Sequence, residues 1–185
     1  MLVYILLLLS VFIQKYETQP YEVLQQFDQT DQIELRFYPA AMMVAIESPK
    51  ARNGNFNALF RYISGNNEAQ EKIAMTTPVY MFSTAQMQRM AFVLPQKYMH
   101  TAPLPKDEGM ELKKTSPGYF MAIRFGGYSS AEKVAFYTQK LRSTLASEGN
   151  KTKGAPALLS YDAPYKFYNR RNEILVEVER PNGQD

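Results

Sequence analysis

The sequence contains no cysteine, no tryptophan and only one histidine. Without cysteine the chain has no disulfides, no thiolate zinc site and no cysteine nucleophile. The single imidazole, His100, leaves little room for zinc hydrolases or for catalytic triads, because both need at least one well-placed histidine. The residue inventory therefore favours a binding protein over an enzyme.

An excess of charge of one sign is also missing. The 185 residues include 21 Lys and Arg against 18 Asp and Glu, which gives a net charge of +3. The basic residues are scattered, and only Lys113–Lys114 and Arg170–Arg171 are adjacent. This is not the clustered basic surface that nucleic-acid binding requires. Hydrophobic residues make up 45% of the chain, so we expect one folded domain and no nucleic-acid partner.

One long apolar run is present, MLVYILLLLSVFI, at residues 1–13. A helix needs roughly 20 apolar residues to cross a bilayer, so this run suits the core of a signal peptide or a short membrane anchor. We expect residues 1–20 to be an anchor or signal segment with a linker, and residues 181–185 to be a tail. Either reading predicts a membrane-anchored or exported protein on the periplasmic or extracytoplasmic side, with the membrane as a partner.

From residue 21 onward, hydrophobic patterning predicts strands in YEVLQQF, QIELRFYP and AMMVAIES. Phe56, Leu59, Phe60 and Ile63 recur at helical spacing and predict a helix over residues 53–65. KIAMTTPVYMFS and MQRMAFVLP predict further strands, with Pro78 at a bulge or strand end because proline lacks an amide donor.

The same order of patterns recurs in the second half. Glu34 and Val44 have counterparts in Glu111 and Met121 at one offset of 77 positions. A second helix is predicted after Ser129, which forms a capping-box pattern with Glu132. The prediction is an α+β fold, internally duplicated as (ββαββ)2 with pseudo-repeats at about 21–98 and 108–180. Because clefts between repeated units are common ligand sites, this organisation also favours a binding module.

Five motifs in order make the chain resemble the SOUL/heme-binding protein family: IELRFYP (33–39), FNALFRYISGNNEAQEKIAMTTPV (56–79), FVLP (92–95), FGGYSS (125–130) and YDAPYKFYNRRNEILVEV (161–178). The resemblance covers residues 21–178. It implies a distorted antiparallel β-barrel or sheet flanked by two long α-helices, and non-catalytic binding of heme or another tetrapyrrole in an apolar cleft, for transport or buffering.

The resemblance also implies where the ligand binds, between the first helix and the loop before the last strand. The matching helix positions are Leu59, Phe60, Arg61, Ile63 and Ser64, and the matching loop positions are Tyr165, Lys166, Phe167, Tyr168, Arg170 and Arg171. Aromatic and aliphatic side chains would cover the macrocycle, while the basic groups would meet its propionates through charge-assisted hydrogen bonds.

The chain departs from the family pattern at one informative position. Some members carry a proposed axial histidine where this chain has Phe37. His100 is the remaining imidazole, and a solvated loop role is its default; tyrosine or methionine also ligate heme iron. We therefore expect reversible binding that does not depend on an axial histidine. Two alternatives stay open: a binding module for another apolar small molecule, and a hydrolase that uses a carboxylate such as Glu173.

Overall fold

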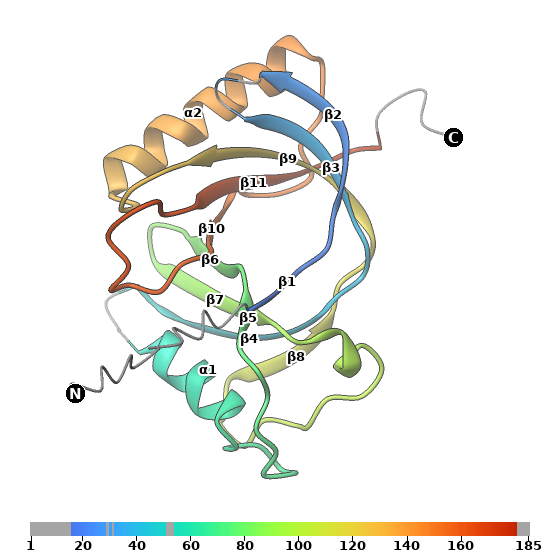
Figure 1. Cartoon of the computed structure of the whole chain (residues 1–185), viewed down its shortest axis with the longest axis vertical. Coiled ribbons are helices and arrows are strands. Elements are labelled where there is room, and N and C mark those ends of the chain that lie inside the picture. Colours follow the sequence, from blue (N-terminus) through green and yellow to red (C-terminus); the bar gives the residue numbers. More distant parts are fainter. Residues whose placement is uncertain (1–15, 29, 31, 51–53, 181–185) are drawn as a thin grey trace, which may run out of the picture.

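The chain folds as an α+β structure in which a strongly curved antiparallel sheet carries two helices on its outer side (Figure 1). The computed structural model describes residues 16–180 except 29, 31 and 51–53. Its elements in chain order are β1 (Glu17–Thr18), β2 (Glu22–Asp28), β3 (Ile33–Tyr38), β4 (Met42–Pro49), α1 (Asn55–Ile63), β5 (Thr76–Thr77), β6 (Val79–Ser83), β7 (Met87–Val93), a 3-10 turn (Gln96–Tyr98), β8 (Met110–Lys114), β9 (Gly118–Phe125), α2 (Ala131–Ser147), β10 (Ala157–Ser160) and β11 (Asn172–Val178).

Nine strands form the main sheet in the order β2-β3-β9-β11-β10-β6-β7-β4-β8, and each of its pairings is antiparallel. From β3 to β8 this order is symmetric. If β3 is exchanged with β8, β4 with β9, β6 with β10 and β7 with β11, the same order is obtained when it is read from the other end. A separate two-stranded parallel sheet joins β1 to β5.

The sheet is not a closed barrel, which corrects the expectation of a barrel. Tyr38 at the end of β3 pairs with Gly118 at the start of β9. Met42 at the start of β4, four residues after Tyr38, pairs with Lys114 at the end of β8, four residues before Gly118. The two stretches thus form one ribbon in constant register, interrupted between β3 and β4. Pro39 and Pro117 lie in the interruption. Because proline has no backbone N–H, the hydrogen-bond ladder stops where the ribbon bends. The strands β2 and β8 are the two edges of the sheet.

The two helices differ in length, which corrects the expectation of two long helices. α2 has 17 residues, but α1 has only nine and ends at Ile63. Gly65 follows with a φ of 114°, a backbone conformation that L side chains rarely adopt, so the helix cannot continue. The first residue of the expected helix, Asn53, lies outside the described residues.

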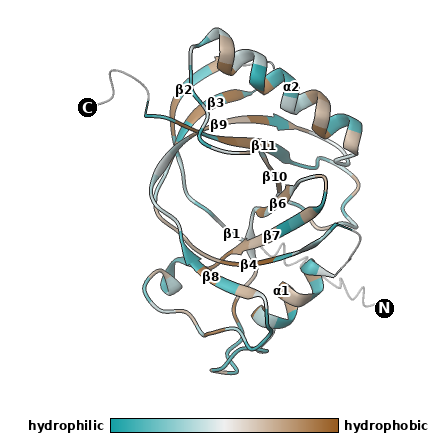
Figure 2. Cartoon of the chain, turned by 180° about the vertical axis from the view of Figure 1, so that it is seen from behind, coloured by the Kyte–Doolittle hydropathy of each residue, from teal (hydrophilic) through white to brown (hydrophobic). Residues whose placement is uncertain are grey.

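The sheet separates three apolar clusters. One lies beneath α2 and includes Leu35, Ile123 and Leu141, and a second lies beneath α1 and includes Leu59 and Phe92. The third lies on the concave side and consists mainly of alanine and aromatic side chains: Tyr38, Ala41, Ala45, Tyr80, Ala91, Val93, Ala122, Ala157, Leu159 and Leu175. Figure 2 shows apolar residues concentrated along the strands that the helices cover. Small side chains on the concave side leave room inside the curve.

The first described residues run across to β5. Gln19 N–H donates to the carbonyl of Thr77 at 2.8 Å, and its side-chain Oε1 accepts from the Tyr80 hydroxyl at 2.7 Å. In the described part of the chain, no helix is long and apolar enough to cross a membrane. The apolar run at residues 1–13 and the expected tail at residues 181–185 lie outside the described residues.

Candidate functional site

The helix residues of the expected site fall on two faces of α1. Leu59 and Ile63 are buried against the sheet, at 0% and 4% exposure. Phe60 is 49% exposed and stacks on Phe56, with ring centroids 6.0 Å apart. Because helix residues four apart lie one above the other, these two rings form an aromatic strip on the outer face. Arg61 is also exposed, as is Ser64 just after the helix.

Arg61 has one carboxylate partner. Its Nη2 lies 3.0 Å from Asp107 Oδ2, and Asp107 also accepts from the Asn66 side-chain amide at 2.9 Å. An ion pair this exposed contributes only about 0–1 kcal/mol. The Arg61 guanidinium can therefore exchange Asp107 for another anion at little cost.

The loop from 161 to 171 carries the most exposed aromatic residues of the described chain. Tyr165 is 83% exposed, Phe167 is 76% exposed and Tyr168 is 66% exposed. Phe167 packs edge-on against Tyr168, with centroids 5.4 Å apart. Lys166 is half-buried and forms an ion pair with Asp162 at 2.5 Å. Apart from these contacts within the loop, most of the surface of the three rings is open to solvent and available to a ligand.

Arg170 and Asp162 hold this loop in place. Arg170 is buried, and its Nη1 donates to the carbonyls of Ala163 and Lys166 at 2.7 and 2.6 Å. The second carboxylate oxygen of Asp162 accepts from the Arg171 N–H at 2.6 Å. Both contacts cross the loop, so we assign Arg170 a role in loop shape.

Arg171 belongs to a buried polar cluster on the concave side. Its Nη2 donates to Glu173 Oε1 at 2.7 Å, and Arg36 Nη1 donates to Glu173 Oε2 at 2.7 Å. The hydroxyl of Tyr161 also donates to Oε2, at 2.9 Å. Glu173 has 0% exposure and Arg36 has 2%. One carboxylate thus holds two arginines from opposite ends of the chain, and Arg36 is further neutralised by Glu34.

Protonation within the cluster follows from this geometry. Burial disfavours the charged carboxylate of Glu173, but the hydrogen bonds and charges of Arg36 and Arg171 outweigh it, so its pKa lies below the ordinary value. Burial raises the pKa of Tyr38 to about 12 and shifts that of Tyr161 upward as well. The cluster is therefore a set of fixed ion pairs and neutral phenols at neutral pH, with no group poised to exchange a proton.

The two expected segments lie on the same side of the molecule in Figures 1 and 2. Among the described residues, no hydrogen bond, ion pair or ring contact joins α1 to the loop. We call the exposed side chains Phe56, Phe60, Tyr165, Phe167 and Tyr168 the aromatic face. These residues lie on two separate segments, and none of the expected ligand-binding residues lines either of the cavities described below.

The two positions considered for an axial ligand lie apart from the aromatic face. Phe37 shares the α2 side of β3 with Ile33 and Leu35 and packs against Tyr119, with centroids 5.4 Å apart. His100 is exposed just after the 3-10 turn. Within the part of the chain that the structure describes, no group of three or more His, Cys, Asp or Glu side chains is placed to hold a metal ion.

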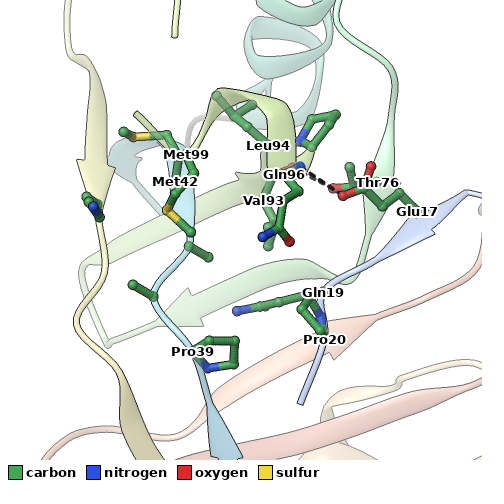
Figure 3. A pocket seen from close by; sticks show the side chains of 14 residues that line it. Glu17, Gln19, Pro20, Pro39, Met42, Thr76, Val93, Leu94, Gln96 and Met99 are labelled. Carbon is green, nitrogen blue, oxygen red and sulfur yellow. Dashed lines mark hydrogen bonds between the residues drawn. The ribbon is translucent and has the colours of Figure 1, made fainter. Parts of the chain in front are cut away.

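The structure has two cavities; the sequence favoured a cleft between the repeated units but did not identify the residues that line it. The smaller, of about 290 Å³, lies between the first described residues and the end of β7; Figure 3 shows Gln19 and Pro20 facing Pro39, and Glu17 bound to Gln96. The larger, which we call the inner cavity, has a volume of about 610 Å³ on the concave side. Gln19 and Pro39 line both. Alanines on the concave side of the strands, such as Ala91 and Ala157, leave this space, and they are the sequence feature that could have indicated it.

A family model for the SOUL heme-binding protein matches residues 16–177. The chain belongs to this family. Heme-binding protein 1 of Xenopus tropicalis is 28% identical over 123 residues, which cover 63% of this chain and 65% of that protein. Heme-binding protein 1 of Sus scrofa is 23% identical over 86% of this chain and 92% of its own. Human heme-binding protein 2 is 28% identical over 82% of this chain and 81% of its own. The chain thus spans about two thirds of the length of the Xenopus relative.

Solved structures support the fold of this SOUL family chain and nothing finer. The C-terminal domain of EcmrR superposes with a TM-score of 0.60 at 11% identity, over 82% of this chain and 99% of its own. A hydrolase from Listeria innocua gives a TM-score of 0.57 at 9% identity, over 80% of this chain and 91% of its own. At such identities the likeness is one of architecture alone.

Proposed function

We propose that the protein binds heme or a related tetrapyrrole reversibly on the aromatic face, for transport or buffering. One observation carries the proposal: the exposed aromatic side chains of α1 and of the loop from 161 to 171 occupy the two segments that the family pattern marks as the ligand surface. Flat apolar rings suit a flat apolar macrocycle, because contact between them removes apolar area from water on both sides. The binding of heme by relatives, as their names state, supports the choice of ligand.

The propionates of a tetrapyrrole need basic partners, and the candidates differ in availability. Arg61 on α1 is exposed and held only by an exposed carboxylate. Lys166 in the loop is held by Asp162 but keeps a third of its side chain exposed. Arg171 already donates to Glu173 and to Tyr21. Arg170 is buried, and its Nη1 donates to loop carbonyls while its Nε has no hydrogen-bond partner among the described residues. We therefore assign propionate binding to Arg61, with Lys166 as the second partner.

Iron ligation by an imidazole is not part of the proposal. Phe37 fills the family's histidine position on the α2 side of the sheet, away from the aromatic face. Tyr165 and Tyr168 bring phenol oxygens to the aromatic face, and tyrosinate is a known ligand of heme iron. Apolar contact is the main source of affinity in this arrangement, which is compatible with a carrier that must release its ligand.

A non-catalytic role is part of the proposal. The carboxylate considered for a hydrolase, Glu173, is inaccessible to a substrate, and arginines occupy both of its oxygens. Its lowered pKa removes it further from the range of a general acid at neutral pH. A hydrolase with this architecture exists, but at 9% identity it supports no shared chemistry.

Hemin titration followed by the Soret absorbance tests the proposal. The full-length protein should give a saturable shift, and Phe167→Ala or Phe60→Ala should weaken binding about tenfold, the equivalent of about 1.4 kcal/mol. Arg61→Glu should weaken it further, because it places a carboxylate next to a propionate. The bound spectrum should lack bis-imidazole features.

Phe136→Ala is the matched control, since Phe136 is an exposed phenylalanine on α2 outside both segments. Its affinity for hemin should equal that of the wild type. A wild-type protein that shows no saturable shift at micromolar concentration would remove heme from the account. Equal loss in Phe136→Ala and Phe167→Ala would instead move the ligand off the aromatic face.

We also propose that residues 1–13 attach the domain to a membrane or direct its export. The length and unbroken apolar character of the run support this. Cell fractionation should place the full-length chain in the membrane or exported fraction, and a chain that lacks residues 1–13 should move to the cytosol. Recovery of the full-length chain wholly in the cytosol would contradict both readings.

We further infer that the domain, from about residue 21 to residue 180, arose by duplication of a ββαββ unit. The symmetric strand order supports this inference, and so do Pro39 and Pro117, which lie in the interruption of the ribbon, one from each half. Each half is completed by a strand of the other, since β3 pairs with β9 and β8 pairs with β4. Separately expressed halves should therefore fold only when mixed, as read by circular dichroism.

A further inference from the structure

The inner cavity lies on the opposite side of the sheet from the helices. Its floor is buried and apolar, made of Tyr38, Tyr80, Ala91, Ala157 and Leu175. Its half-buried wall is formed by Met43, Phe82, Met87 and Phe120. A volume of about 610 Å³ is in the range of pockets that enclose most of a small organic molecule.

The floor offers ring faces but no free charge. Tyr38 and Phe120 meet edge-on with centroids 5.3 Å apart, and Tyr80 and Phe82 stack at 6.3 Å. The hydroxyl of Tyr80 donates to Gln19. That of Tyr38 accepts from Arg36, whose charge is in turn neutralised by Glu173 and Glu34. A charged group placed on this floor would lose its hydration without gaining a counter-ion, so the floor selects an uncharged aromatic group.

The mouth of the cavity is balanced in charge. Its exposed lining residues include Lys113, Lys114, Glu47 and Glu177. Arg89, which also lines the cavity, pairs with Glu111 at 2.6 Å. With two cations against two carboxylates and the remaining arginine paired, the rim favours neither sign of ligand.

The geometry points to a second ligand site in the inner cavity, for an uncharged aromatic small molecule. This site is separate from the heme surface of the proposed function: no residue of the aromatic face lines it, and the curved sheet lies between them. The protein would then carry two apolar ligands of different shape, a flat macrocycle outside and a compact aromatic molecule inside.

Two fluorescent probes that differ by a single sulfonate test the class of ligand. N-phenyl-1-naphthylamine is uncharged, and 1-anilinonaphthalene-8-sulfonate is its anionic counterpart. Titrated into the full-length protein, the uncharged probe should show saturable, blue-shifted emission and bind at least tenfold more tightly. Tighter binding of the sulfonated probe would overturn the assignment of an uncharged ligand, and saturation by neither probe would overturn the site.

A bulky residue at the mouth tests the location. Ala155 is exposed and lines the cavity, so a large side chain at this position would stand at its mouth. Ala155→Trp should weaken binding of the uncharged probe at least tenfold. Ala135→Trp makes the same change on the exposed face of α2 and should leave binding unchanged. Equal effects of the two variants would place the probe elsewhere.

A charge inside the cavity gives a second, independent variant. Phe82→Glu puts a carboxylate on the half-buried wall, and it should abolish probe binding while the thermal unfolding transition remains cooperative. Probe binding by a folded Phe82→Glu protein with wild-type affinity would contradict the proposal.

Hemin competition separates this proposal from the proposed function. Saturating hemin should leave the affinity of the uncharged probe unchanged, and Ala155→Trp should leave hemin binding unchanged. Competitive displacement, with Ala155→Trp weakening both ligands, would mean that one site serves both and would overturn the second site. If hemin fails to bind while the probe binds and responds to Ala155→Trp, the proposed function fails and the inner site stands.

Discussion

At the scale of single residues, the feature with the greatest energetic consequence is Glu173. Two hydrogen-bonded arginines and the Tyr161 hydroxyl meet its carboxylate in a site without solvent exposure. Burying charges is costly, so the cluster is stable only while the negative centre is present to offset the two arginines. It occupies the concave side next to the inner cavity and ties β3 to the end of the loop that carries the aromatic face.

Replacing this carboxylate with the neutral isostere should therefore be severely destabilising. We expect Glu173→Gln to lower the free energy of unfolding by about 3–5 kcal/mol, because it leaves Arg171 without its counter-ion and Arg36 with Glu34 alone. Urea unfolding measures the loss.

Glu111→Gln is the control for that change, since Glu111 pairs with Arg89 in an exposed position. Its cost should be under about 1 kcal/mol. Similar losses in the two variants would mean that the buried cluster contributes no more than a surface ion pair.

The pH dependence of stability follows from the lowered pKa of Glu173. The folded pKa lies below the unfolded value of about 4.3, so the contribution is complete above that pH and is lost as the pH falls through the folded pKa. Urea midpoints measured from pH 7 to pH 3 should fall below about pH 4.3. If Glu173→Gln, where it folds, loses stability with acid as steeply as the wild type, other carboxylates are responsible.

At the scale of elements, most of the strands could be predicted because their patterns are local. Strands were predicted for the runs around Ile33–Tyr38, Met42–Pro49 and Met87–Val93, and the structure confirms them. The site was harder. The exposure of Phe60, Phe167 and Tyr168 depends on tertiary packing, which spacing within one segment does not record.

Helix ends show the same limit of local patterns. The capping pattern pointed to Ser129, but α2 begins after Ser130, whose Oγ accepts from the Lys133 N–H at 3.3 Å. Two adjacent serines offer equivalent caps, and only the path of the chain after Phe125 decides between them. Pro78, by contrast, was expected at a strand boundary and separates β5 from β6, since its missing amide is a local property.

The loop from 161 to 171 yields a prediction at this scale. Arg170→Ala removes the guanidinium that holds the carbonyls of Ala163 and Lys166, so the loop should open. Hydrogen exchange of residues 161–171 should accelerate, and hemin binding should weaken through the loss of loop shape. Arg142→Ala, an exposed position on α2, is the control. Unchanged exchange in Arg170→Ala would show that the loop holds its shape without this side chain.

At the scale of the whole molecule, the curved sheet divides the protein into an outer and an inner side. The outer side carries the helices and the aromatic face, and the inner side carries the buried cluster and the inner cavity. The order and pairing of the strands make this division, because the helices of both halves fall on the outer side and leave alanines on the concave one. The sequence alone did not predict which residues lie on which side, because this depends on the order in which the strands pair.

The most direct measurement of the central claim is the line broadening that paramagnetic ferric hemin causes in the amide NMR spectrum of the protein. Broadening should be concentrated in residues 56–64 and 165–171, which carry the aromatic face. Amides around the inner cavity, such as those of Phe82 and Ala155, should keep their line widths. Broadening centred on the inner cavity, with the loop and α1 unaffected, would contradict the claim that the aromatic face binds heme.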